Sequence, residues 1–262
     1  KGTILRKALD GETNVDHSVP DKETGIDTAS GNWNAATRIR VQAKEDARKI
    51  WTAMKDAPYI DNWNNFNVTK SDDISELFTL LNVNVQDYHS SSSDCGVNET
   101  TKAAFADKDG IADDIRGLIN FVRGIDYFDY DGDCQITEVR DHVLGDVYHS
   151  QLIEVGPPNA SIDFSSSNEE AYFRSINNYQ GFKALHASRT KVIYAGSNSG
   201  MLHAICAEEV GSANCEAGKE LWGFIPPFIA SVIPEIINPD YDGTVDGNGG
   251  TNPIFGVDGS PV

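Results

Sequence analysis

The sequence has few basic residues and no long apolar run, and both absences limit what the protein can bind or cross. Among its 262 residues, 21 Lys and Arg face 40 Asp and Glu, giving a formal net charge of −19. Such a field repels phosphate backbones and anionic lipid headgroups, so nucleic-acid binding is not expected. Apolar runs approaching about 18 residues are missing, so no membrane span is predicted. The chain begins at Lys1 without a signal peptide and stops within an expected strand, so we interpret it as a piece of a longer protein.

The common catalytic motifs are also missing. The Cys and His spacings fit no zinc set, and neither a P-loop nor a G-x-G-x-x-G segment occurs. The segment 196–200 is not a nucleophile elbow, because Asn198 stands at its centre instead of Ser. His203 falls in an expected strand, where we predict a buried, hydrogen-bonded core histidine. The sequence therefore does not indicate an enzyme.

Three short β-runs near the C-terminal end are the most informative part of the chain. They cover Val192–Ala195, Met201–Ile205 and Leu221–Ile225. The Ser197–Gly200 segment between the first two has turn chemistry, because Asn and Gly tolerate positive φ. Together these runs predict an antiparallel meander, the unit from which propeller blades are built.

Helical patterns occupy the first half. Apolar spacing favours a helix over 34–54, while an alternative ends it near Lys44 and makes 48–52 a strand; periodicity does not decide between them. Further helices are expected at 73–81 and 111–122. From residue 143 the texture changes to short β-runs. We therefore expect a mixed, mainly β fold of antiparallel meanders, with a helix-containing segment 1–142 preceding the first propeller blades at 143–262.

The aromatic residues are expected to be buried. Residues 157–189 form a long polar excursion, and its anchors are predicted to be Tyr172, Phe173, Tyr179 and Phe182. The tryptophans are expected in the core, namely Trp33, Trp51, Trp63 and Trp222.

Alternating carboxylates form the strongest chemical motif. Calcium takes about six to eight oxygen ligands, which a tight acidic loop can supply. Asp129, Asp131 and Asp133 would occupy the first, third and fifth positions of such a loop, and Gln135 would offer its carbonyl at the seventh. Two features depart from an EF-hand: Gly132 comes one place early, and Arg140 replaces the final Glu. The closing carboxylate would then come from Glu138 or Asp141, and the rival interpretation is an acidic surface turn.

A second acidic stretch offers an alternative calcium site. Asp107, Asp109 and Asp113 resemble the short calcium repeats of thrombospondin-like modules. The competing interpretation is that these residues cap and favour the first turn of the helix at 111–122. The sequence leaves both open.

The strand region resembles the C-terminal propeller of the PilY1/PilC family of type IV pilus biogenesis proteins. The matching positions are Asn198, Gly200, Met201, Leu202, His203, Ala204, Glu220, Phe224, Ile225, Pro226, Val257, Asp258, Gly259, Ser260 and Pro261. Sparser similarity lies at 31–35, 48–52 and 144–150, the last resembling the strand that opens the propeller. The resemblance implies a β-propeller, calcium loops, and disulfides rather than free thiols. Cys206 and Cys215 would staple a hairpin insertion, and Cys95 would pair with Cys134.

The resemblance also implies a function. We expect a non-catalytic, calcium-binding assembly and adhesion protein of the pilus, at the cell exterior or the outer-membrane surface of a bacterium. Its partners would be pilin subunits or minor pilins, and host or abiotic surfaces. Two alternatives remain open at this stage: a quinoprotein-like or hydrolytic propeller enzyme, and a structural subunit of an extracellular filament.

Overall fold

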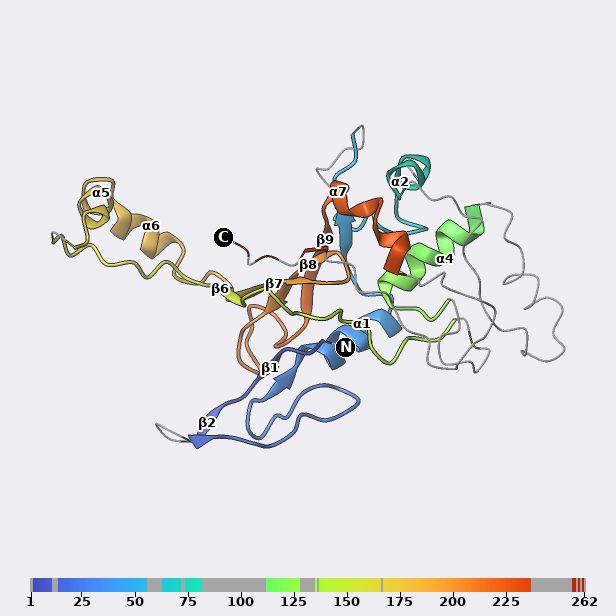
Figure 1. Ribbon diagram of the computed structural model, residues 1–262. Coiled ribbons are helices and arrows are strands. Elements are labelled where there is room, and N and C mark those ends of the chain that lie inside the picture. Colours follow the sequence, from blue (N-terminus) through green and yellow to red (C-terminus); the bar gives the residue numbers. More distant parts are fainter. Residues whose placement is uncertain are drawn as a thin grey trace, which may run out of the picture.

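The computed structural model is built around one five-stranded sheet, with helices against one face and a helical arm standing away from it (Figure 1). It describes residues 2–10, 14–55, 63–71, 74–81, 112–127, 135, 137–165, 167–236, 256–257, 259 and 261. In this described part, no helix combines the length and apolar character that crossing a membrane requires.

The central sheet has the strand order β5-β9-β8-β7-β6. Its strands are β5 (Ile50–Thr52), β6 (Ile153–Val155), β7 (Val192–Ser197), β8 (Met201–Cys206) and β9 (Glu220–Ile225). The β7-β8-β9 meander is antiparallel, as the sequence predicts, and β6 extends it in the same sense. β5 pairs with β9 in parallel, so a strand from the first half of the chain completes the sheet.

Local chemistry explains the central hairpin. Ser197 pairs with Met201, and the three residues between them form the turn from β7 to β8. Gly200 has φ of 80° and donates its N–H to Ser197 C=O at 3.1 Å. A side chain is disfavoured in this left-handed conformation, so glycine sets the register of the hairpin here.

The helices cover the inner face of the sheet. They are α1 (Ala35–Lys44), α2 (Ile74–Leu81) and α4 (Ala112–Arg123). α1 begins at Asn34, whose side chain caps the N–H groups of Ala36 and Thr37, and it ends at Lys44. The alternative that placed a strand at 48–52 is therefore correct. Ile50, Met201 and Ile225 of the sheet share one core cluster with Leu77, Leu118 and Phe121 of α2 and α4.

Short elements complete the described fold. β1 (Leu5–Arg6) pairs with β4 (Trp33–Asn34), and β2 (Leu9–Asp10) pairs with β3 (Asn14–Val15). After β9 come α7 (Pro227–Ala230) and the 3-10 helix η2 (Ile233–Ile236). The expected fold class, mixed and dominated by antiparallel strands, is confirmed; a closed propeller is not part of what the described residues form.

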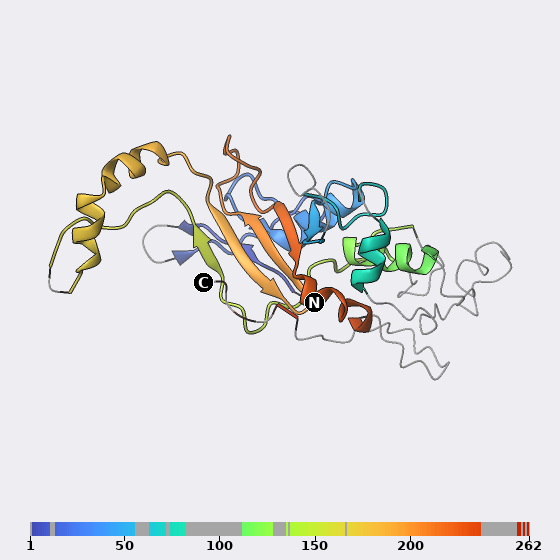
Figure 2. The same cartoon turned by 90° about the horizontal axis from the view of Figure 1, so that it is seen from above.

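Two expectations about strands and anchors are wrong. Residues 144–150 do not form a ladder strand; they run beside the β7-β8 turn, where Asn198 N–H donates to Asp146 C=O at 2.8 Å. The excursion after β6 forms α5 (Glu170–Ile176) and α6 (Tyr179–Leu185). Of its predicted anchors, Tyr172, Phe173 and Phe182 are exposed, and the partly buried Tyr179 contacts Ala160 of the same excursion. Figure 2 shows these helices arching away from the sheet.

The tryptophans are divided between the core and the outer face of the sheet. Trp33 is buried in the core, as expected. Trp51 of β5, Trp222 of β9 and the exposed Trp63 instead form an aromatic row, with the Trp51 and Trp63 ring centroids 4.9 Å apart. The expectation of four core tryptophans is therefore right for Trp33 alone.

Candidate functional site

The acidic segment after α4 is closed at its base by an antiparallel contact. Ile125 forms an isolated bridge with Val139. Asp126 N–H donates to Glu138 C=O at 2.9 Å. The two ends of the segment 127–137 are therefore held together.

Arg140 fastens this closure to α4. Its guanidinium carbon lies 3.9 Å from the centroid of the Phe121 ring, and its Nη2 donates to Phe121 C=O at 2.8 Å. Its N–H also donates to Gly124 C=O at 2.9 Å. Gly124 has φ of 118°, which lets the chain turn out of α4 towards the loop. The departure from the EF-hand pattern at Arg140 thus has a structural use.

The structure describes three of the six predicted ligands of this loop. Gln135 is exposed, and Glu138 is partly buried at the closure. Asp141 lies beyond the closure, where its Oδ1 is 3.7 Å from Arg40 Nη2. Glu138 is therefore better placed than Asp141 to close the loop. The other three, Asp129, Asp131 and Asp133, lie outside the described residues.

Asp126 is a carboxylate that the sequence reasoning did not single out. It is buried at the foot of the loop, with 3% of the residue exposed. A buried carboxylate is rare unless a partner or a cation compensates its charge. Its position next to a predicted acidic loop is the signal that could have identified it.

The second candidate loop lies mostly outside the described residues. Asp107 and Asp109 lie outside the described residues, and Asp113 lies in the first turn of α4. Across the described residues, no three side chains of the His, Cys, Asp or Glu type gather as a metal site.

A buried arginine joins the acidic loop's supporting helix to the sheet. Arg48 donates through Nη1 to the C=O groups of Val122 and Arg123, at 3.3 and 3.0 Å, at the end of α4. Its Nε and Nη2 donate to the two carboxylate oxygens of Glu220 on β9, at 2.7 and 2.9 Å. A cation at a helix C-terminus also suits the helix dipole. Arg48 therefore fixes α4, and with it the foot of the loop, against β9.

The carboxylate of Glu220 also accepts a hydrogen bond from a histidine. His203 Nδ1 lies 2.7 Å from Glu220 Oε1, and His203 Nε2 lies 3.0 Å from Ser197 Oγ. Because a carboxylate only accepts, Nδ1 carries the hydrogen of this ring. Burial by itself would raise the pKa of the Glu220 carboxyl. The Arg48 charge and the hydrogen bonds from His203 and Arg48 outweigh burial and hold that pKa far below its ordinary value.

This Ser197–His203–Glu220 arrangement has the connectivity of a hydrolase triad but not its accessibility. A nucleophile must touch its substrate, whereas Ser197 and His203 are each 1% exposed and Glu220 is 3% exposed. A cavity of about 440 Å³ lies where β6 and β7 meet the arm, and its lining includes none of these three residues. The expectation of a buried, hydrogen-bonded His203 is confirmed. The three hydrogen-bonded side chains join β7, β8 and β9.

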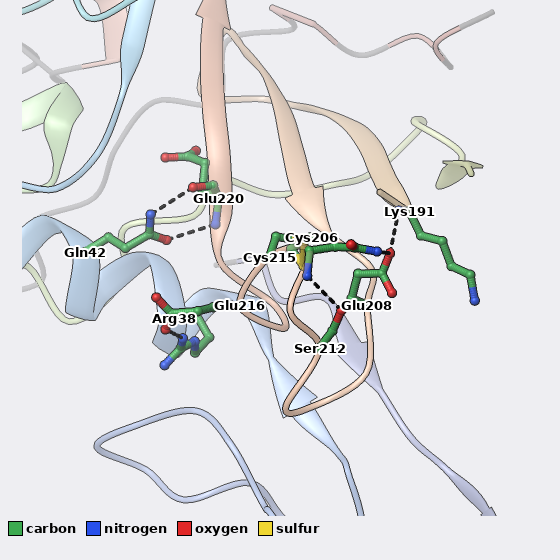
Figure 3. Close-up of a disulfide and its surroundings, with 10 residues drawn as sticks. Arg38, Gln42, Lys191, Cys206, Glu208, Ser212, Cys215, Glu216 and Glu220 are labelled. Atoms are coloured by element: carbon green, nitrogen blue, oxygen red, sulfur yellow. Dashed lines mark hydrogen bonds and ion pairs between the residues drawn. A yellow bond between two sulfur atoms is a disulfide. The ribbon is translucent and has the colours of Figure 1, made fainter. Parts of the chain in front are cut away.

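A disulfide braces the insertion that leads into β9. Cys206 and Cys215 are bonded, with their Cα atoms 6.1 Å apart, which staples the insertion between β8 and β9. Figure 3 shows two residues of α1 holding the same region: Arg38 beside Glu216, and Gln42 against the backbone of Glu220. The second pair that the resemblance favours, Cys95 with Cys134, lies outside the described residues.

These features describe a protein built around a sheet, whose central polar residues Ser197, His203 and Glu220 are buried. Comparisons with known proteins then give its relatives. It is 32% identical over 103 residues, 39% of the chain, to the type IV pilus biogenesis factor PilY1 homolog of Xylella fastidiosa. It is 31% identical over 158 residues, 60% of the chain, to the type IV pilus biogenesis factor PilY1 of Pseudomonas aeruginosa. The expected similarity to PilY1 proteins is confirmed.

The similarity concerns a small part of those relatives. The matched stretches amount to 7% and 11% of their lengths. No family model matches the chain. No solved structure matches it either.

Proposed function

We propose that this chain is part of a type IV pilus-associated assembly and adhesion protein that binds calcium and does not catalyse a reaction. The similarity to two PilY1 proteins carries the proposal, because both are named as pilus biogenesis factors. The burial of Ser197, His203 and Glu220 supports a non-catalytic role for the described sheet. The partners would be pilin subunits, minor pilins or a host or abiotic surface, at the bacterial cell exterior.

The calcium site would use oxygen ligands from the loop closed by Ile125 and Val139. Asp129, Asp131 and Asp133 would supply carboxylates, Gln135 a carbonyl, and Glu138 the closing carboxylate. Oxygen donors of this kind fit a hard cation, and the held base fits a ligand loop. When bound, the ion supplies positive charge that offsets the repulsion among these carboxylates.

The described contacts link that loop to the central sheet. The foot of the loop packs on α4, and Arg48 ties the end of α4 to Glu220 on β9. Ordering the loop would therefore stabilise the sheet. The role of the chain's residues is mechanical: they hold a surface in shape.

Thermal unfolding with and without chelator tests the calcium site. A ligand at about 100 times its Kd stabilises a protein by about 2.7 kcal/mol, which corresponds to a shift of roughly 5–10 °C for a chain of this size. We expect chelation to lower the Tm of the unaltered protein and to leave the Asp131→Ala variant unchanged. Asp163→Ala, in the arm, is the matched control and should keep the full response to calcium. A Tm indifferent to chelator in the unaltered protein would refute the calcium site.

Surface piliation tests the pilus role separately. The Asp131→Ala substitution, placed in the chromosomal gene, should reduce the number of surface pili, whereas Asp163→Ala should not. Normal piliation after deletion of the whole gene would refute the assembly role, whatever the calcium measurement shows.

A further inference from the structure

The segment between β6 and β7, residues 157–191, has the properties of a docking arm. It carries α5 and α6 and stands clear of the sheet in both views (Figures 1 and 2). Among its described residues only Ala171 is buried. Large apolar side chains that stay exposed in a contiguous segment mark an interaction surface. Those of the arm are Phe164, Tyr172, Phe173, Ile176, Phe182 and Leu185.

Internal hydrogen bonds hold the arm in shape, although it has no hydrophobic core of its own. Arg174 donates to Ser161 C=O at 2.7 Å and to Asn168 Oδ1 at 2.8 Å, which braces the start of α5. Ala160 N–H donates to the Tyr179 hydroxyl at 3.0 Å, which ties the two sides of the arm together. The exposed apolar groups are therefore held in place before any partner arrives, which lowers the entropy cost of binding.

The root of the arm is fastened to the edge of the sheet. Arg189 Nε donates to Gly156 C=O at 2.7 Å, so the entry and exit of the arm are joined. This contact directs the arm outward from β6 and β7. α5 lies farther from the sheet than α6 (Figure 1), and its exposed Tyr172, Phe173 and Ile176 can be covered by a surface from another molecule.

Charge separates the arm from the rest of the molecule. Its four Lys and Arg outnumber its three Asp and Glu, for a formal charge of +1. Since the whole chain carries −19, the remainder carries −20. The stretch from Tyr179 to Lys191 holds three cations and no carboxylate. The arm is thus the part of the surface where an acidic partner meets the least repulsion.

We propose that the arm docks on the acidic body of a second copy of this chain, each copy lending its arm to the other. Contact between two bodies is opposed by their like charges, whereas contact between an arm and a body pairs opposite charges and covers the apolar groups of the arm. A reciprocal exchange uses the same two patches twice and closes as a twofold dimer. The apolar side chains supply the affinity, and Lys183, Arg189 and Lys191 orient the arm.

Sedimentation velocity of the 262-residue protein over a range of concentrations tests this proposal. The unaltered protein should form a concentration-dependent dimer. Phe173→Ser and Leu185→Ser should each raise the dimer Kd by about tenfold or more, and Lys183→Glu should raise it severalfold. Phe228→Ser is the matched control, because Phe228 is as exposed as Leu185, 76% each, but lies on α7. Circular dichroism confirms that each variant is folded.

Three results would overturn the proposal. The first is a protein that stays monomeric at every concentration. The second is a dimer that Phe173→Ser and Leu185→Ser leave unchanged. The third is a monomer that binds phosphatidylcholine vesicles and loses this binding in the same two variants, because the arm would then contact a lipid surface.

Discussion

Two arginines hold two regions of this molecule by similar contacts in opposite surroundings. Arg48 bonds to two helix carbonyls and a carboxylate, with 1% of its side chain exposed. Arg174 bonds to a carbonyl, an amide oxygen and the carboxylate of Glu170 in the arm; its side chain is 21% exposed and that of Glu170 is 88% exposed, against 0% for Glu220. The number of hydrogen bonds is similar at the two arginines. Because the Arg48–Glu220 ion pair is buried, breaking it is costly, whereas breaking the exposed Arg174–Glu170 pair is not.

Removing the buried carboxylate should have the largest effect. Glu220→Gln would leave Arg48 without its counter-charge inside the protein, and we expect a loss of about 3–5 kcal/mol in the free energy of unfolding. Urea denaturation followed by circular dichroism measures this loss. The matched control is Glu170→Gln, which removes an exposed partner of Arg174 and should cost no more than about 0.5 kcal/mol. Equal losses in the two variants would contradict the comparison.

Opening the disulfide should have the next largest effect. Cys206 and Cys215 are nine residues apart, and a closed loop of this size stabilises a fold by roughly 2–3 kcal/mol. The double variant Cys206→Ala with Cys215→Ala should lose about that much in urea denaturation. Ser212→Ala, in the same loop, is the control and should stay close to the unaltered protein. An unchanged midpoint in the double variant would mean that α1 alone holds the insertion.

Acid should gradually remove the stabilisation that the buried Glu220 carboxylate provides. The pKa of Glu220 lies below its ordinary value of 4.5 in the folded protein, so the unfolded chain takes up this proton first as the pH falls. The stabilisation by Glu220 is therefore complete well above pH 4.5 and is lost below it, by up to about 1.4 kcal/mol for each pH unit. Urea denaturation at several pH values measures this slope. Glu220→Gln should have a shallower slope, and an identical slope in both proteins would contradict the assignment.

The sequence predicts the elements whose signals are local. The β7-β8 hairpin follows from turn chemistry at Asn198 and Gly200, and α4 follows from apolar spacing between residues 111 and 122. The choice between helix and strand at 48–52 needed the structure. It depends on the parallel pairing of β5 with β9, a contact between residues far apart in the chain.

The buried contacts of Glu220 and the exposed arm both show what the sequence alone could not predict. His203 and Glu220 each match the pilus family in the sequence, yet only the fold brings Arg48 and His203 to the same carboxylate of Glu220. Phe173 and Tyr172 were expected to be anchors because aromatic residues are usually buried. Composition does not reveal that no part of the described body lies near enough to cover them.

The smallest effect is expected in the arm itself. Phe173 of α5 is 62% exposed, whereas Phe121 of α4 is 1% exposed. Phe121→Ala should therefore cost about 3–5 kcal/mol in urea denaturation, while Phe173→Ala should change stability by no more than about 0.5 kcal/mol. The measurement belongs at high dilution, where any contact between copies is dissociated. A large loss for Phe173→Ala under those conditions would mean that the arm packs on its own body, and the contrast between the two regions would disappear.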